Sequence, residues 1–260
     1  MNSTDPNLEQ AAQHILSSQY VVALVGAGLS VESGVPTFRG PGGLWTKLGE
    51  PSMNGFQDFV RDPATWWKEQ QAQQRDPDRA HFREAIEKAK PNQGHYALAD
   101  LEHMGILKMT ITQNVDDLHA QAGQEMLAEI HGNRTKMRCI SCESRWHREH
   151  FDGDDYPLTC PDCQGLVKSD TVMFGEPIPK SVLETCFRHT ELSDCMIVIG
   201  TSATVYPAAS FPSIVQGNGG VFIEANPNPT PLSGAADVVL RGPTGETLPD
   251  LVKRIRALSG

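Results

Sequence analysis

The amino-acid sequence predicts an α/β protein with a Rossmann-like, doubly wound parallel sheet and a smaller second domain, part helical and part zinc-binding. Three observations lead to this prediction. Apolar runs of strand length alternate with helical patterns, the first run ends in a Gly-x-Gly turn, and two Cys-x-x-Cys pairs follow later in the chain. Alternating strands and helices are typical of parallel sheets that helices cover on both faces.

The chain opens with a predicted helix. Asp5 suits the cap, Pro6 suits the first helical position, and apolar residues then follow at helical spacing up to Leu16. The first strand covers residues 20–25, where apolar side chains at nearly every position indicate burial on both faces. Further strands are predicted at residues 106–112, 196–199, 221–223 and 238–240, and a closing helix at 247–258.

Two segments interrupt this alternation. Residues 40–91 are rich in Gly, Pro, Trp and Gln and contain helical patches such as 81–90, whereas residues 139–167 are polar, carry four cysteines and show few strand signals. We therefore assign the chain to two domains. The sheet domain takes residues 1–40, 92–130 and 170–260, and the small domain takes residues 41–91 and 131–169.

Composition and charge narrow the function classes. The 260 residues carry 22 Lys and Arg against 32 Asp and Glu, a formal net charge of −10. An acidic chain is a poor candidate for sequence-independent binding to nucleic acid, which needs clustered cations. No apolar run approaches the ~20 residues of a membrane span, and the polar first ten residues do not resemble a secretory signal. We expect a cytoplasmic protein that binds neither membranes nor nucleic acid directly.

The first predicted strand runs into Gly26-Ala27-Gly28-Leu29-Ser30. A strand, a Gly-x-Gly turn and a helix form the phosphate cradle of dinucleotide-binding folds, because backbone N–H groups there face the pyrophosphate. The usual fingerprint is incomplete, since Val31 replaces the third glycine and no clear ribose-binding acid follows. On this motif alone, an ordinary strand-to-helix turn is an equal alternative.

The cysteine pairs have the spacing of a two-knuckle zinc site. Cys139-x-x-Cys142 and Cys160-x-x-Cys163 are separated by 17 residues. Four thiolates hold Zn²⁺ in a closed tetrahedron, so we expect a structural ion, with two disulfides or a redox pair as the alternatives. Cys186 and Cys195 lack such spacing and are expected to be core thiols.

Polar residues follow several predicted strands, where a doubly wound sheet presents its chemistry. Residues 112–117, Thr-Gln-Asn-Val-Asp-Asp, follow the second strand; a ligand site and a helix cap by Asp116 or Asp117 are equal alternatives there. His131 lies at the predicted domain junction and is the favoured general base, with His119 as its rival.

Taken in order, these pieces resemble the sirtuin family of NAD-dependent protein-lysine deacylases. The resemblance spans residues 15–255, and the order of its separate motifs makes it specific. The stretches that carry it are Gly26 to Gly40, Thr112-Gln113-Asn114-Val115-Asp116, His131-Gly132, the four cysteines, Phe174-Gly175-Glu176, Gly200-Thr201-Ser202 and Asn226.

The resemblance implies a role for each matched position. His131 would be the catalytic base, with Asn114 and Asp116 also catalytic. NAD would contact Gly26, Ala27, Gly28, Ser30, Phe38, Arg39, Gln113, Asn114, Asp116, Gly200, Thr201, Ser202, Asn226 and Thr244. The loop at residues 40–43 would close over the cofactor. Substrate would contact Val172, Phe174, Gly175, Glu176 and Val205, and Zn²⁺ would be held by Cys139, Cys142, Cys160 and Cys163.

The implied reaction consumes NAD. An acyl-lysine protein or peptide would add as an extended strand, and its acyl group would pass to ADP-ribose, releasing nicotinamide, lysine and O-acyl-ADP-ribose. Two alternatives are an ADP-ribosyltransferase, whose relatives often lack the catalytic His, and a non-catalytic NAD-binding module. His131, Gln113, Asn114 and Asp116 favour the deacylase over both.

The acyl group is expected to be neutral. Relatives that remove succinyl or malonyl groups carry Tyr-x-x-Arg in the helical insertion, and the Arg fork binds the acyl carboxylate. Counted from Asp62-Pro63, these positions are Gln70 and Gln73 here, while Arg75 lies nearby. Because glutamine supplies no cation, we expect weak desuccinylation.

Overall fold

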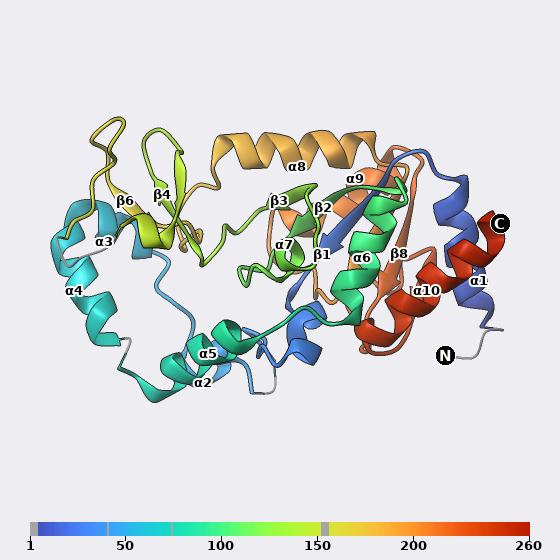
Figure 1. Cartoon of the computed structure of the whole chain (residues 1–260), viewed down its shortest axis with the longest axis horizontal. Helices are drawn as coiled ribbons and strands as arrows, with labels where there is room; N and C mark the ends of the chain where they lie inside the picture. The colour runs from blue at the N-terminus through green and yellow to red at the C-terminus, as the bar shows by residue number, and fades with distance from the viewer. Residues whose placement is uncertain (1–4, 41, 74, 152–155) are drawn as a thin grey trace.

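The computed structural model describes residues 5–40, 42–73, 75–151 and 156–260, and it contains two β-sheets (Figure 1). The larger sheet has six parallel strands in the order β3-β2-β1-β7-β8-β9. This is the doubly wound order in which the chain reverses direction across the sheet beside β1. Its strands are β1 (Val21–Val25), β2 (Leu107–Thr112), β3 (Leu127–Glu129), β7 (Cys195–Ile199), β8 (Val221–Ala225) and β9 (Val238–Leu240).

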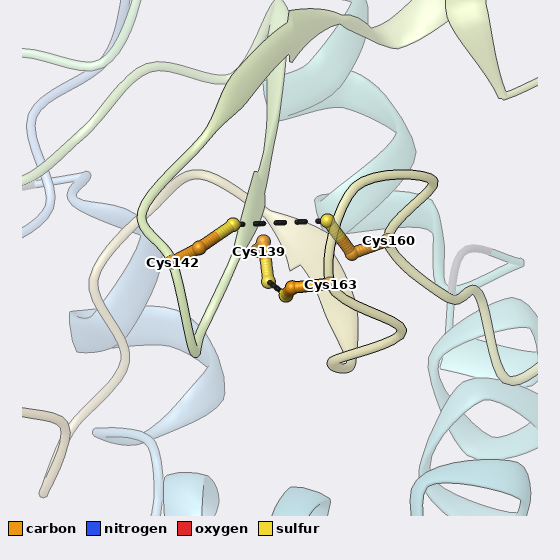
Figure 2. A group of neighbouring side chains, drawn as sticks. All are labelled: Cys139, Cys142, Cys160 and Cys163. Carbon is orange, nitrogen blue, oxygen red and sulfur yellow. Dashed lines mark hydrogen bonds between the residues drawn. The ribbon is translucent and has the colours of Figure 1, made fainter.

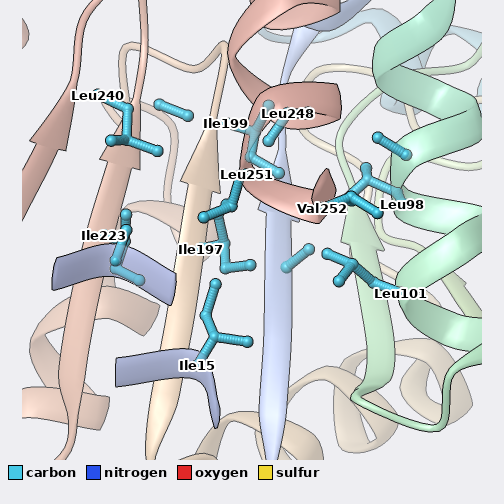
Figure 3. Close-up of a cluster of buried hydrophobic side chains, with 14 of the residues drawn as sticks. Ile15, Leu98, Leu101, Ile197, Ile199, Ile223, Leu240, Leu248, Leu251 and Val252 are labelled. Carbon is cyan, nitrogen blue, oxygen red and sulfur yellow. The ribbon is translucent and has the colours of Figure 1, made fainter. Parts of the chain in front are cut away.

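Helices cover both faces of this sheet, as the apolar strand pattern predicts. Along β1, Val21, Ala23 and Val25 face one core cluster, and Val22 and Leu24 face the other. Figure 3 shows the first cluster, where apolar side chains of the sheet meet those of the covering helices. The first face is covered by α1 (Pro6–Ser17), α6 (Gln93–His103) and α10 (Thr244–Ser259), and the second by α8 (Lys180–Leu192) and α9 (Phe211–Gly217).

Local hydrogen bonds explain where the first and last helices begin. Asp5 accepts a hydrogen bond from the N–H of Asn7 at 2.9 Å and Pro6 begins α1, which confirms the predicted cap. The last helix begins three residues earlier than expected, at Thr244. The Glu32 carboxylate accepts from the N–H of Gly245 at 2.6 Å there, and an anion at a helix N-terminus is favourable.

Helices α3 and α4 of the insertion share one apolar core with the cysteine segment, whereas α5 packs near the glycine turn through Phe82 and Ile86. Phe59 and Trp67 of the insertion pack with Met137, Val167 and the cysteines of a three-stranded antiparallel sheet. That sheet was not expected, because its strands are only three or four residues long. The elements are α2 (Leu44–Leu48), α3 (Gly55–Arg61), α4 (Pro63–Gln73), α5 (Pro77–Lys88), β4 (Lys136–Cys139), β5 (Arg145–His147) and β6 (Val167–Ser169).

Short elements complete the connections. The Gly-x-Gly turn leads into a 3₁₀ helix rather than an α-helix, and β3 is a further short strand that the sequence pattern did not predict. These elements are η1 (Ala27–Ser33), α7 (Leu118–Gln121), η2 (Arg148–His150) and η3 (Ala208–Ser210). Among the described residues, none of the helices has the length and apolarity that crossing a bilayer requires.

Candidate active site

The glycine turn lies where the strand order reverses, between the ends of β1 and β7. Gly26 donates its N–H to Ile199 O at 2.9 Å, and Gly28 donates to Gly200 O at 2.7 Å. A Cβ at position 28 would lie 2.6 Å from Gly200 O, so the contact between the two strand ends itself requires glycine. In an open α/β sheet, the crevice at this reversal is where ligands bind.

Three polar side chains form a buried network beside this turn. Ser30 Oγ donates to Asp116 Oδ2 at 2.7 Å and accepts from Asn114 Nδ2 at 3.1 Å. The Asn114 amide also donates to Gly26 O at 3.1 Å. The network therefore joins the turn after β1 to the polar segment after β2 and fixes the orientation of each group.

Asp116 contacts both the start of α7 and the buried network; its role at a ligand site stays a prediction. Its Oδ1 accepts from the N–H of Leu118 at 3.1 Å and so caps α7, while its Oδ2 faces Ser30. Asp117 does not cap the helix with its side chain; it adopts a left-handed conformation with φ 70° and accepts from Asn133 Nδ2 at 2.7 Å.

The residues that follow β2, β7 and β8 are joined by hydrogen bonds. Gln113 Nε2 donates to Thr201 Oγ1 at 3.0 Å, and Asn226 Nδ2 donates to Thr201 O at 3.2 Å. Ser202, next to Thr201, is exposed. Thr244 is buried at the start of α10, and its hydroxyl faces the Glu32 carboxylate at 3.4 Å.

His131 follows β3 and contacts the end of β2. Its Nδ1 lies 3.2 Å from Gln113 O. Because a carbonyl only accepts, Nδ1 carries the proton, which leaves Nε2 of the neutral ring as an acceptor. Burial lowers the pKa of His131, and the Gln113 hydrogen bond opposes that shift. The ring is therefore neutral at pH 7 and able to take a proton.

The rival histidine lies inside the protein. His119 is buried, its Nδ1 pairs with Gln124 Oε1 at 2.7 Å, and its ring stands edge-on to that of His95. Burial lowers the pKa of His119 as well, and the Gln124 hydrogen bond opposes that shift. Because His119 is buried inside the protein, His131 is the better candidate for a group that contacts the substrate.

A small pocket opens beside the buried network. Several of its residues were not expected as site residues, notably Phe82 and Ile86 of α5, although their i, i+4 spacing marks an apolar helix face. Among the lining residues, Asp116 is the ionisable one. The pocket is lined by Ala27, Ser30, Val35, Pro36, Phe38, Phe82, Ile86, Asn114, Val115 and Asp116.

Aromatic contacts pack Phe38 and Arg39, which follow η1, against neighbouring side chains. Phe38 packs against Trp45 and Phe82, with ring centroids 4.8 and 5.2 Å apart. The Arg39 guanidinium lies 4.6 Å from the centre of the Trp45 ring and pairs with Glu50 at 2.8 Å. Within the loop at residues 40–43, position 41 lies outside the described residues, and closure of that loop stays a prediction.

The predicted substrate segment, residues 172–176, lies directly beside His131. The N–H of Val172 donates to His131 O at 2.9 Å, and the Phe174 ring meets Trp45 edge-on at 5.2 Å. The side chain of Glu176 is 2% exposed and pairs with Arg138 and Lys168. Its carboxylate is therefore occupied within the protein. Val205, the other predicted substrate contact, lies in the turn after β7.

The four predicted zinc ligands converge (Figure 2). Their sulfur atoms all lie within 4.8 Å of one another, with Cys139 to Cys163 at 3.5 Å and Cys142 to Cys160 at 3.7 Å. Zn–S bonds of about 2.3 Å in a tetrahedron place the sulfurs about 3.8 Å apart, so the cluster suits a structural zinc ion. Cys186 and Cys195 are buried core thiols, as predicted.

Comparison with known proteins agrees with this site. The model of the Sir2 family matches residues 26–207. An NAD-dependent protein deacylase from Pyrococcus furiosus is 41% identical over 260 residues, covering 97% of this chain and 99% of the relative. NAD-dependent protein deacylase 1 from Archaeoglobus fulgidus is 42% identical over 248 residues, covering 95% of this chain and 98% of the relative.

Solved structures give the same result. A Sir2 homolog–NAD complex aligns with a TM-score of 0.78 at 41% identity, covering 97% of this chain and 95% of the other. A Sir2 complex with a deacetylated p53 peptide and 3′-O-acetyl ADP-ribose aligns with a TM-score of 0.75 at 31% identity, covering 95% of this chain and 97% of the other. With the family model and both relatives spanning most of the sequence, the chain belongs to the Sir2 family.

Proposed function

We propose that this protein is an NAD-dependent protein-lysine deacylase whose catalytic base is His131. One observation carries the proposal. A neutral imidazole with a free acceptor nitrogen lies beside a strand end whose polar segment also forms the Ser30–Asn114–Asp116 network. The names of the relatives, NAD-dependent protein deacylases, support the activity.

We place the nicotinamide end of NAD at that network and the adenosine end at Thr201 and Asn226. The proposed cofactor contacts remain Gly26, Ala27, Gly28, Ser30, Phe38, Arg39, Gln113, Asn114, Asp116, Gly200, Thr201, Ser202, Asn226 and Thr244. The Gly28 N–H is already bonded to Gly200, so other backbone groups of the turn would face the pyrophosphate. The solved complex of a Sir2 homolog with NAD supports NAD as the ligand.

The chain's own groups then account for the chemistry. Asn114 and Asp116 would hold the carboxamide and ribose so that the bond between ribose and nicotinamide breaks and neutral nicotinamide leaves. The acyl oxygen of the substrate lysine captures the ribose carbon. His131 Nε2 takes the proton of a ribose hydroxyl, whose oxygen attacks the acyl carbon. With one water consumed, lysine and O-acyl-ADP-ribose are released.

We place the substrate peptide between residues 172–176 and Val205, as an added strand. The solved Sir2 complex with a deacetylated peptide supports a peptide substrate. Zinc takes no part in these steps, since four thiolates leave no open coordination position. The division into a sheet domain and a small domain, with a crevice between them, belongs to the same proposal.

The test is mass spectrometry of an acetyl-lysine peptide incubated with the protein and NAD. The deacylase releases one O-acetyl-ADP-ribose and one nicotinamide for each acetyl group lost. ADP-ribose attached to protein with the acetyl group retained would identify a transferase instead. Unchanged peptide and NAD, with NAD still bound, would identify a binding module and overturn the proposal.

We further propose a preference for neutral acyl groups. Gln70 and Gln73 stand where the relatives that remove succinyl groups carry Tyr and Arg, and neither glutamine supplies a cation. A succinyl carboxylate that is buried without such a partner is costly. Acetyl-lysine peptide should react faster than succinyl-lysine peptide of the same sequence. The double variant Gln70→Tyr and Gln73→Arg should raise the succinyl rate, and succinyl preference in the unaltered protein would refute this proposal.

A further inference from the structure

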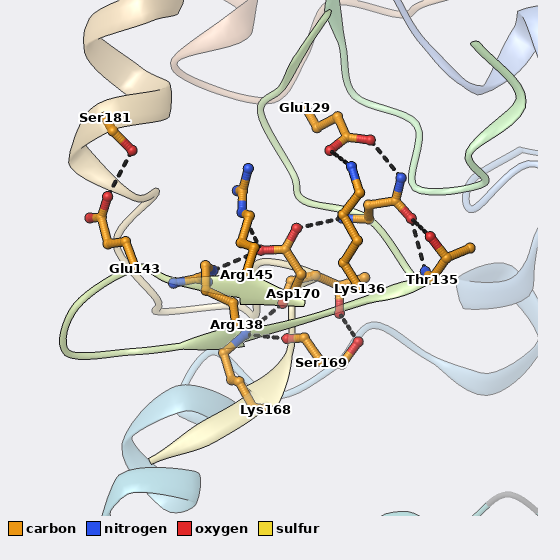
Figure 4. A network of polar contacts seen from close by, with 12 residues as sticks. Glu129, Thr135, Lys136, Arg138, Glu143, Arg145, Lys168, Ser169, Asp170 and Ser181 are labelled. Atoms are coloured by element: carbon orange, nitrogen blue, oxygen red, sulfur yellow. Dashed lines mark hydrogen bonds and ion pairs between the residues drawn. The ribbon is translucent and has the colours of Figure 1, made fainter. Parts of the chain in front are cut away.

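Beside the predicted substrate segment lies a network of charged side chains, in which Lys168, Arg138 and Asp170 have no part in the proposed reaction; Figure 4 shows these three. Lys168 and Asp170 are 0% exposed, Glu176 is 2% exposed and Arg138 is 4% exposed. Burying charges costs several kcal/mol each, and replacing such groups by apolar ones often stabilises a protein. A buried network of this size therefore needs a reason other than stability.

Lys168 holds the turn that precedes the segment. Its ammonium donates to Ser169 O at 2.9 Å and to Thr171 O at 2.7 Å, and it pairs with Glu176 Oε2 at 2.9 Å. All three protons are thus used. Burial lowers the pKa of Lys168 to about 8, and the nearby charge of Glu176 opposes that shift, so the group is charged at pH 7.

Glu176 closes the segment at its other end. Its Oε2 accepts from the N–H of Met173 at 2.7 Å, and its own N–H donates to Met173 O at 3.1 Å. Its Oε1 pairs with Arg138 on β4 at 2.6 Å. These bonds make residues 173–176 a closed turn. Ion pairs of Glu176 with Arg138 of β4 and Lys168 of β6 attach this turn to the three-stranded sheet.

Asp170 connects the same network to the turn that carries His131. Its Oδ1 pairs with Arg138 at 2.8 Å and with Arg145 at 3.1 Å, and its Oδ2 accepts from the N–H of Asn133 at 3.1 Å. A Cβ at Gly132, where φ is 76°, would lie 2.1 Å from Asp170 O, so the two backbones touch.

From these contacts, we propose that Lys168, Arg138 and Asp170 are positioning residues for the substrate peptide. They hold residues 172–176 in one register against His131, whose carbonyl accepts from Val172. A peptide that adds to this segment would then present its acyl-lysine at a fixed place relative to the imidazole. The inference rests on the proposed deacylase function and names the residues that serve its peptide site.

The test is the steady-state kinetics of Lys168→Met with acetyl-lysine peptide and NAD varied separately. Methionine keeps the length of the side chain but cannot hold Ser169 O, Thr171 O or Glu176. We expect the KM for peptide to rise about tenfold or more, while the KM for NAD and kcat change less than about twofold. A merely structural role would lower the amount of active protein without moving the KM for peptide, and that result would overturn the inference.

Two further variants make the test specific. Lys168→Arg keeps the cation and should restore the KM for peptide. Lys136→Met also breaks an ion pair of the β4 sheet, with Glu129 at 2.8 Å, but not one that holds residues 172–176, so its KM for peptide should stay unchanged. A rise in Lys136→Met equal to that in Lys168→Met would contradict the proposal.

Zinc content shows whether each variant is folded. If Lys168→Met loses its zinc, the kinetic test is repeated with Glu176→Gln. The amide of this variant has the shape of the Glu176 carboxylate but not its charge. A normal KM for peptide in that variant would overturn the inference. The unaltered protein is assayed beside the variants. If it does not deacylate the peptide, the proposed function fails, whereas an active protein with unchanged variants refutes the positioning role alone.

Discussion

One hydrogen bond sets the tautomer of His131, the proposed catalytic base. Gln113 O accepts from Nδ1, which leaves Nε2 as the acceptor, and burial lowers the pKa so that the ring is neutral. The His131→Ala variant should lose about 100-fold or more in kcat, the usual contribution of a general base. It should keep its fold and its affinity for NAD, because the ring contributes one backbone contact.

The measurement is deacetylation kinetics together with calorimetric titration of NAD. His103→Ala removes an exposed imidazole at the end of α6 and serves as the control, with full activity expected. Normal turnover in His131→Ala would show that another group takes the proton.

His95 links stability to pH. Burial lowers its pKa from 6.5 to about 3 in the folded protein, and the neighbouring His119 adds to the shift. The unfolded chain therefore binds the proton first. The contribution of His95 to the free energy of unfolding is nearly constant above pH 6.5. As the pH falls from 6.5 toward 3, this residue lowers the free energy of unfolding, by about 2 kcal/mol at pH 5.

Urea unfolding at pH 7 and pH 5 measures this effect. The His95→Gln variant should lose less stability between the two pH values than the unaltered protein, because it has one buried imidazole fewer to protonate. Comparing the two proteins cancels the contribution of carboxylates and thiols. An equal loss in both would contradict the role assigned to His95.

At the scale of elements, the sequence pattern predicted the apolar strands of the large sheet, including the three-residue β9, and missed β3, β4, β5 and β6. Strands such as β1 and β7 have apolar side chains at every position, which is a strong local signal. By contrast, β4, β5 and β6 each place charged residues within only three or four positions. They form because of pairing, the shared core with Phe59 and Trp67, and the cysteine cluster, none of which a local pattern contains.

The cysteine cluster supplies a prediction at this scale. Cys139 belongs both to β4 and to the zinc cluster, so Cys139→Ser should lose the metal and destabilise the three-stranded sheet first, because structural zinc contributes directly to folding. Hydrogen exchange should show lost protection in β4 and β6 while β1 and β7 stay protected. The matched control is Cys186→Ser in the buried face of α8, which should keep its zinc. Zinc retained in Cys139→Ser would count against the cluster.

For the whole molecule, the sequence predicted candidate residues for the site but not their mutual contacts. Gln113, Asn114, Asp116 and His131 stand at ends of strands, where a parallel sheet brings ligand-binding groups together. Phe82 and Ile86 were missed because they come from the insertion, whose contacts with Phe38 and Val35 depend on tertiary structure. The network of Lys168, Arg138 and Asp170 was missed for the same reason, since its partners are brought together by strand pairing.

The central claim is that one crevice brings the ribose of NAD, an acyl-lysine amide and the His131 imidazole together. The most direct test is a crystal structure with an acetyl-lysine peptide and a non-hydrolysable NAD analogue. We expect the carboxamide at Ser30, Asn114 and Asp116, the peptide paired with residues 172–176, and His131 Nε2 about 2.6–3.2 Å from a ribose hydroxyl. An imidazole turned away from the sugar in every bound state, or a peptide bound elsewhere, would contradict the account.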